Sequence, residues 1–154
     1  ADLRIAFDFD GVLADDSAER VFQSGGLEEY QENESALAEV PLDRGPMADF
    51  LEKINRIQGL EDSKSVDDPQ GYRRRVRVAV MTARSAPAHE RAINSIRQWG
   101  LSVNDAFFLG GLPKGPMLEV LQPHIFFDDQ RRHVEGASLS TPSVHIPFGA
   151  INRQ

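Results

Sequence analysis

Five short apolar segments, separated by segments with helical character, constrain what this 154-residue chain can fold into. Each segment is rich in β-branched or aromatic residues and ends near glycine or polar residues, which is typical of buried strands. The predicted strands are residues 3–9, 76–81, 106–110, 124–129 and 143–149. Helical patterns at residues 86–100, 114–122 and 131–137 alternate with them. This alternation predicts a parallel sheet covered by helices on both faces, an α/β fold of the three-layer Rossmann-like type.

The stretch between the first two strands departs from this alternation. Residues 15–39 are polar and acidic, with apolar residues at helical spacing, and a second helical pattern runs from Pro46 to Ile57. Residues 59–72 carry Gly and Pro among polar residues, and we predict a loop there. A small helical cap, inserted after the first strand, is the domain arrangement that these patterns favour. The predicted domains are a core of residues 1–14 and 72–154 and a cap of residues 15–71.

Composition and charge exclude several classes of function. No apolar run approaches the roughly 20 residues of a membrane-spanning helix, and the first residues do not resemble a signal peptide, so we expect a cytoplasmic protein without membrane contact. The absence of cysteine excludes disulfides and thiolate chemistry. The net charge of −7 disfavours nucleic-acid polymers as partners, because binding them requires cationic side chains. We interpret the basic run at residues 72–77 as a solvated approach to a strand or a contact within a homo-oligomer.

Reactive side chains stand at or just after four of the predicted strands. They are Asp8 and Asp10 in the first, Thr82 after the second, Lys114 after the third, and Asp128 and Asp129 in the fourth. In open α/β sheets, ligands bind beyond the carboxyl ends of the strands. We therefore expect these groups to converge on one site.

The acidic members of this set predict a metal. Side chains alternate between faces along an extended strand, so Asp8 and Asp10 are expected to share a face. Neighbouring carboxylates repel each other, and Asp128 would add to the repulsion. Clustered oxygen ligands suit Mg²⁺, which also takes an oxygen from a bound phosphate. We predict that Asp8, Asp10, Asp128 and Asp129 bind Mg²⁺.

The same groups suit hydrolysis of a phosphate ester. Asp8 is predicted to be the nucleophile that forms an aspartyl-phosphate. Asp10 is predicted to protonate the leaving alcohol and later to activate water. The Thr82 hydroxyl, the backbone at Ala83 and the Lys114 ammonium are predicted to bind the phosphate. All of these groups are needed, because the uncatalysed reaction is very slow.

Each of these residues also has a structural explanation. Asp8 alone can have a structural role in a turn, although Asp10 and the DFDGV context favour function. Thr82 can cap a turn, Lys114 can be an exposed residue at a helix start, and Asp128 and Asp129 can cap the next helix. Arg84 has two interpretations of equal weight, a contact to substrate or a pair with a surface acid. The histidines show no ligand spacing, and we interpret them as structural; they are His89, His124, His133 and His145.

The order of these motifs resembles that of the haloacid dehalogenase-like superfamily of phosphotransferases. The motifs are DFDGV at residues 8–12, MTA at 81–83, Lys114 and FFDD at 126–129. Longer stretches, residues 82–101, 106–130 and 145–149, together with His133–Val134, resemble the cytosolic type I 5′-nucleotidases. That resemblance implies removal of phosphate from nucleoside monophosphates with Mg²⁺.

Two departures from that family stand out. Its members have FDGDAV where this chain has FDFDGV, and both acids, Asp8 and Asp10, are kept. Its members also carry an N-terminal half that has no counterpart here, so the resemblance implies that this chain is the catalytic half alone.

Three functions remain open from the sequence. The first is a Mg²⁺-dependent 5′-nucleotidase, for which phosphate release should disappear in Asp8→Asn and in EDTA. The second is a phosphatase of another small phosphomonoester, such as a sugar or cofactor phosphate. The third is a nucleotide-binding module without turnover, and the presence of all four motifs argues against it.

Overall fold

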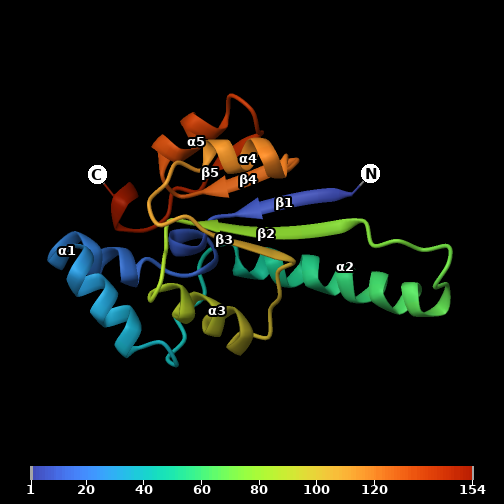
Figure 1. The fold of residues 1–154 in the computed structure, drawn as a ribbon, viewed down its shortest axis with the longest axis horizontal. Helices are drawn as coiled ribbons and strands as arrows, with labels where there is room; N and C mark the ends of the chain where they lie inside the picture. Colours follow the sequence, from blue (N-terminus) through green and yellow to red (C-terminus); the bar gives the residue numbers. More distant parts are fainter. Residues whose placement is uncertain (1, 154) are drawn as a thin grey trace.

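The computed structural model describes residues 2–153 (Figure 1). Its elements are β1 (Leu3–Phe7), η1 (Phe9–Leu13), α1 (Ser17–Ala36), α2 (Ala48–Asp67), β2 (Val76–Thr82), α3 (His89–Gln98), β3 (Asp105–Phe108), α4 (Gly115–Leu121), β4 (Ile125–Asp128), α5 (Arg131–Ala137), β5 (Ser143–His145) and η2 (Ala150–Asn152). No helix in this part of the chain is both long and apolar enough to cross a membrane.

The strands of the described residues form one parallel sheet in the order β3-β2-β1-β4-β5. This confirms the predicted α/β, Rossmann-like fold. β1 lies at the centre, and Ile5 is paired with Val78 of β2 on one side and with Ile125 of β4 on the other. The residues that follow β1 therefore emerge between those that follow β2 and β4.

Consecutive strand residues pack into different cores, because side chains alternate along a strand. Figure 1 shows α2 and α3 on one face of the sheet and α4 and α5 on the other. Phe7 belongs to the core shared with α2 and α3, whereas Ala6 belongs to the core shared with α4 and α5. The first core includes Leu51, Ile54, Val78, Val80, Ala92, Ile96 and Phe127, and the second includes Ala79, Met81, Leu118, Phe126 and Ala137.

The two helices between β1 and β2 lie in different places. α2 runs along the sheet and buries Leu51 and Ile54 in the first core, whereas α1 lies beyond the carboxyl ends of the strands (Figure 1). Gly26 interrupts α1 with a left-handed backbone (φ 78°). The division into a core domain and a cap of residues 15–71 stays a prediction.

The predicted loop at residues 59–72 is wrong over its first part, because α2 continues to Asp67. Pro69 is the first residue here that cannot continue a helix, and Gly59 is tolerated within it. Glu61 ties this part of α2 to the start of β2. Its carboxylate accepts hydrogen bonds from the Tyr72 hydroxyl (2.9 Å) and from the N–H groups of Arg75 (2.8 Å) and Val76 (3.2 Å).

Candidate active site

The carboxyl ends of β1, β2 and β4 bring the predicted site residues to one edge of the sheet. Asp8 follows β1, Thr82 ends β2, Asp128 ends β4, and Lys114 directly precedes α4. Asp8, Thr82 and Lys114 line a cavity of about 400 Å³, and so do Asp10, Ala83 and Arg84. The predicted convergence at this edge is therefore present in the structure.

A tight turn after β1 places Asp8. Its N–H donates to the Phe127 carbonyl of β4 (2.8 Å), and its Oδ1 accepts from the Phe9 N–H (2.7 Å). Gly11 gives the turn its left-handed residue (φ 73°), and a Cβ at this position would collide with the carboxylate of Asp129. The glycine of DFDGV therefore allows the turn to pass closely under the acids.

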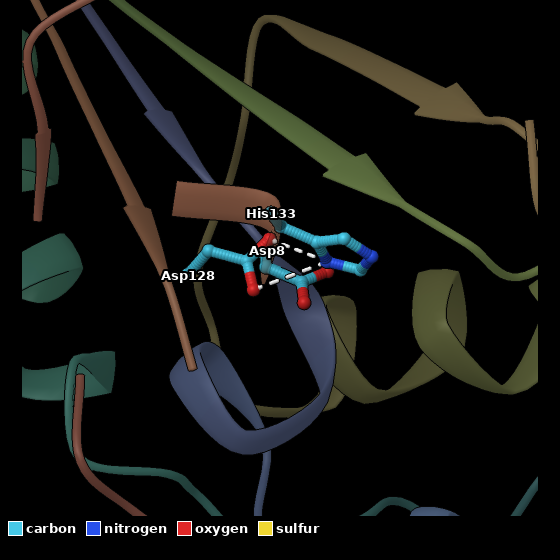
Figure 2. Close-up of side chains that lie close together, drawn as sticks. All are labelled: Asp8, Asp128 and His133. Atoms are coloured by element: carbon cyan, nitrogen blue, oxygen red, sulfur yellow. Dashed lines mark hydrogen bonds and ion pairs between the residues drawn. The ribbon is translucent and has the colours of Figure 1, made fainter. Parts of the chain in front are cut away.

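Lys114 joins two of the acids. Its Nζ lies 3.0 Å from Oδ1 of Asp8 and 2.6 Å from Oδ2 of Asp128, and all three side chains are buried. His133, near the start of α5, brings Nδ1 to 3.2 Å and 3.3 Å from the two Asp128 oxygens. Figure 2 shows Asp8, Asp128 and His133 side by side, and one ligand atom from each lies within 4.8 Å of the others.

This cluster holds more acid than its single ammonium balances. Burial, together with the charges of Asp128, Asp129 and Asp10, raises the pKa of Asp8 well above its usual value, although Lys114 opposes the rise. Burial and the charge of Asp128 raise the pKa of Asp129 to about 7. Burial would also raise the pKa of Asp128, but His133 and Lys114 together lower it.

The residues of this cluster fit a hard divalent cation. Oδ1 of Asp129 is buried and has no hydrogen-bond partner among the described residues, and a buried oxygen in this condition is costly. Carboxylate oxygens are the ligands that Mg²⁺ prefers, and a cation would relieve the repulsion between the acids.

Arg84 pairs with the buried acid Glu34 and the half-buried acid Asp10. Its Nε and Nη2 donate to the two oxygens of Asp10 at 2.8 Å and 2.7 Å, and its Nη1 donates to Glu34 at 2.5 Å. Burial alone would lower the pKa of Arg84, but the charge of Asp10 and the hydrogen bonds to it raise that pKa above its usual value. Arg84 lines the cavity, and its donors are directed mainly at these acids.

The strand argument that placed Asp8 and Asp10 on one face does not hold, because β1 ends at Phe7. Asp10 lies in the turn η1 with an extended backbone (φ −69°, ψ 132°). The two carboxylates reach the same cavity but face different cations, Lys114 for Asp8 and Arg84 for Asp10.

Sequence comparison gives the family. The family model described as 5′-nucleotidase matches residues 1–153. The chain belongs to the 5′-nucleotidase family. It is 38% identical over 136 residues to human cytosolic 5′-nucleotidase 1B, a match that covers 88% of this chain and 22% of that relative. The resemblance to cytosolic type I 5′-nucleotidases is thereby confirmed. No solved structure shows significant similarity to the chain.

The chain spans about a fifth of the length of this curated relative, a smaller share than the catalytic half that the resemblance implied. The match to the family model, over residues 1–153, includes every residue of the cavity described above.

The sequence did not predict that His133 and Glu34 contact residues of the candidate site. His133 contacts Asp128 although no histidine shows ligand spacing; the available signal was its position five residues after Asp128, near the start of the next helix. Glu34 reaches Arg84 from α1, 50 residues away in the chain, and within an acidic helix nothing in the sequence distinguishes it from its neighbours.

The mouth of the cavity is partly apolar. α1 contributes Phe22, Leu27 and Tyr30, and Leu112 contributes from the loop before α4. The rings of Phe22 and Tyr30 are perpendicular, with centroids 6.0 Å apart. The cavity thus combines an acidic floor at the strand ends with aromatic and aliphatic groups farther out.

Proposed function

We propose that this protein is a Mg²⁺-dependent 5′-nucleotidase that hydrolyses nucleoside 5′-monophosphates through an aspartyl-phosphate at Asp8. The main support is the Lys114 bridge between Asp8 and Asp128 at the carboxyl ends of adjacent parallel strands. Ligands bind at this edge in α/β sheets. The human relative is named a cytosolic 5′-nucleotidase, and this proposal extends that activity and location to the present chain.

The predicted metal ligands are Asp8, Asp10, Asp128 and Asp129. Asp8, Asp128 and Asp129 have the stronger support, because both carboxylate oxygens of Asp10 are bonded to Arg84. His133 adjoins the same group of acids. When bound, Mg²⁺ would offset the negative charge of the carboxylates and of the phosphate.

The first step transfers the phosphoryl group to the protein. A carboxylate oxygen of Asp8 attacks phosphorus, and the bond from phosphorus to the 5′ oxygen breaks. The electron pair of that bond goes to the 5′ oxygen, which takes a proton from Asp10. Thr82, the N–H of Ala83 and the ammonium of Lys114 would bind the phosphoryl oxygens in this step.

The second step restores Asp8. Water attacks phosphorus and gives a proton to Asp10, and the bond from phosphorus to the Asp8 oxygen breaks. The products are the nucleoside and inorganic phosphate.

The apolar mouth supports a nucleoside as the leaving group. A planar base can contact Phe22 and Tyr30, whereas a sugar phosphate offers no such surface to these rings. A sugar phosphate as substrate therefore has less support, whereas a cofactor phosphate with an aromatic ring offers the same kind of surface and is separated by the substrate panel.

The test is phosphate release, with Mg²⁺, from a panel of ribo- and deoxyribonucleoside monophosphates, sugar phosphates and cofactor phosphates. We expect release from nucleotides, and we expect it to be lost in EDTA and in Asp8→Asn. Asp49→Asn is the matched control, since the Asp49 side chain is 86% exposed. A preference for a non-nucleotide would reject the proposal, and tight nucleotide binding without release would support a binding module.

A further inference from the structure

Four charged side chains form a continuous chain of ion pairs from the cavity to the contact between α1 and α3. Arg84 donates to both oxygens of Asp10 and, through Nη1, to Oε2 of Glu34. Arg91 of α3 donates to the other Glu34 oxygen, Oε1, at 2.7 Å. Each Glu34 oxygen therefore has its own guanidinium partner.

Glu34 has no exposed surface, so it cannot contact a substrate in the cavity. A buried ion pair is often replaceable by apolar residues without loss of stability, so stability alone does not explain a carboxylate here. What the Glu34 carboxylate does provide is a fixed anionic partner for Arg84 on the side away from Asp10.

Arg84 is held in one orientation by further contacts. Its Nη1 also donates to the Ala88 carbonyl at 2.9 Å. Its Cζ lies 5.2 Å from the ring centroid of Phe9 and 5.7 Å from that of Tyr30. Because the guanidinium is planar and binds Asp10 through two parallel bonds, its orientation sets the plane of the Asp10 carboxylate.

We propose that Glu34 is a positioning residue, which holds Arg84 so that Arg84 fixes the carboxylate of Asp10 toward the leaving oxygen. The inference rests on the proposed function, in which Asp10 exchanges the proton. Small displacements of reacting groups cost on the order of 10²-fold in rate, so a residue without substrate contact can still control kcat. Glu34 lies on the same helix as Phe22 and Tyr30, so the helix that lines the cavity mouth also orients the acid.

The test compares Glu34→Gln with Glu32→Gln, an exposed neighbour on the same helix outside the cavity lining. With Mg²⁺ and a nucleoside monophosphate, we expect Glu34→Gln to lower kcat by roughly 10- to 100-fold and to leave KM within about threefold. Glu32→Gln should match the wild type. A raised KM with unchanged kcat, or kinetics equal to those of Glu32→Gln, would overturn the inference.

A second substrate guards against partial unfolding of the variant. Nitrophenolate leaves without needing a proton, so kcat/KM for p-nitrophenyl phosphate depends little on the Asp10 acid. In one preparation, Glu34→Gln should lose about tenfold more kcat/KM on the nucleotide than on the aryl ester. Unfolded protein lowers both rates equally, so a loss shared equally by the two substrates means a merely structural role. If the wild type does not hydrolyse p-nitrophenyl phosphate, the test rests on kcat and KM for the nucleotide alone, with the outcomes given above.

The outcomes separate the inference from the proposed function. A wild type that releases no phosphate from nucleoside monophosphates contradicts the proposed function, whatever the Glu34 variant does. An active wild type whose Glu34→Gln variant is equally active contradicts only the role of Glu34.

Discussion

Two charge clusters, buried except for the half-buried Asp10, flank the turn after β1, and they differ in balance. We call them the lysine cluster (Asp8, Lys114, Asp128 and Asp129) and the arginine cluster (Asp10, Glu34, Arg84 and Arg91). In the lysine cluster three carboxylates share one ammonium, whereas in the arginine cluster two carboxylates face two guanidinium groups. Only the lysine cluster has the acidic excess that a cation would neutralise.

The two clusters also differ in the hydrogen-bond partners of their carboxylate oxygens. Within residues 2–153, Asp129 keeps a buried oxygen without a partner and has its pKa raised to about 7, whereas both oxygens of Glu34 accept hydrogen bonds from arginine. A buried charge without a partner is more costly than one that is paired and fully hydrogen-bonded. The lysine cluster should therefore cost stability in the metal-free protein, as expected for the proposed metal site.

Removal of the only cation in the lysine cluster should have the largest effect. In Lys114→Met, Asp8 loses the charge that supports its carboxylate, and the phosphate loses a cationic partner. We expect phosphate release to fall by about 10²–10³-fold. Lys53→Met, at an exposed position of α2, should keep full activity. Near-normal activity of Lys114→Met would show that the acids do not need the ammonium.

Disruption of the arginine cluster should affect stability rather than metal binding. Arg91→Met leaves one Glu34 oxygen without its guanidinium partner and should lower the free energy of unfolding by about 3 kcal/mol. Urea denaturation in EDTA and in Mg²⁺ should give the same loss, because this cluster is already balanced. Arg97→Met is the exposed control on α3. A loss of unfolding free energy seen only with Mg²⁺ would contradict this prediction and would mean that the arginine cluster is coupled to metal binding.

Removal of one acid from the lysine cluster should instead stabilise the metal-free protein. At about pH 8 the carboxyl of Asp129 is largely ionised, and its Oδ1 has no hydrogen-bond partner among residues 2–153, so Asp129→Asn should raise the free energy of unfolding in EDTA by about 1–2 kcal/mol. The same variant should show a smaller rise in Tm on addition of Mg²⁺, because binding to the folded state is the source of that rise. Asp43→Asn, at an exposed position, should change neither value. Destabilisation in EDTA would mean that Asp129 has a favourable partner after all.

Glu61 offers a carboxylate outside both clusters, bonded to uncharged donors. Burial alone would raise its pKa, but the hydrogen bonds from Arg75, Tyr72 and Val76 lower it below the usual value. The ionised Glu61 carboxylate therefore stabilises the folded state above the ordinary glutamate pKa. This stabilisation is lost as the pH falls through the lowered pKa of Glu61. Glu61→Gln should cost about 1 kcal/mol near neutral pH and progressively less in acid. A cost that does not change with pH would contradict this assignment.

The sequence predicted the parts of the fold that depend on periodicity. The strands and their order of appearance follow from short apolar runs, and the convergence of Asp8, Lys114 and Asp128 follows from the common direction of parallel strands. The helical end of α2 was not predicted, because its polar residues become ordered through Glu61, which contacts the start of β2.

The contacts that the site residues make with other side chains were harder to predict from the sequence. Arg84 pairs with Glu34 across 50 residues, and a contact of this range depends on where α1 docks, which local pattern does not give. The relative orientation of Asp8 and Asp10 could not be predicted, because it depends on where the first strand ends. β1 ends at Phe7, so the turn around Gly11 and not the alternation of a strand orients both side chains.

The interruption of α1 at Gly26 divides this helix into leading turns and trailing turns. A Cβ added at Gly26 would meet no atom of the described residues within 4 Å, so this position faces open space. Phe22 precedes it, whereas Tyr30 and Glu34 follow it and touch Arg84. The leading turns line the cavity, whereas the trailing turns line it and also contact Arg84. Substitutions in the leading turns are therefore expected to change selectivity more than the chemistry.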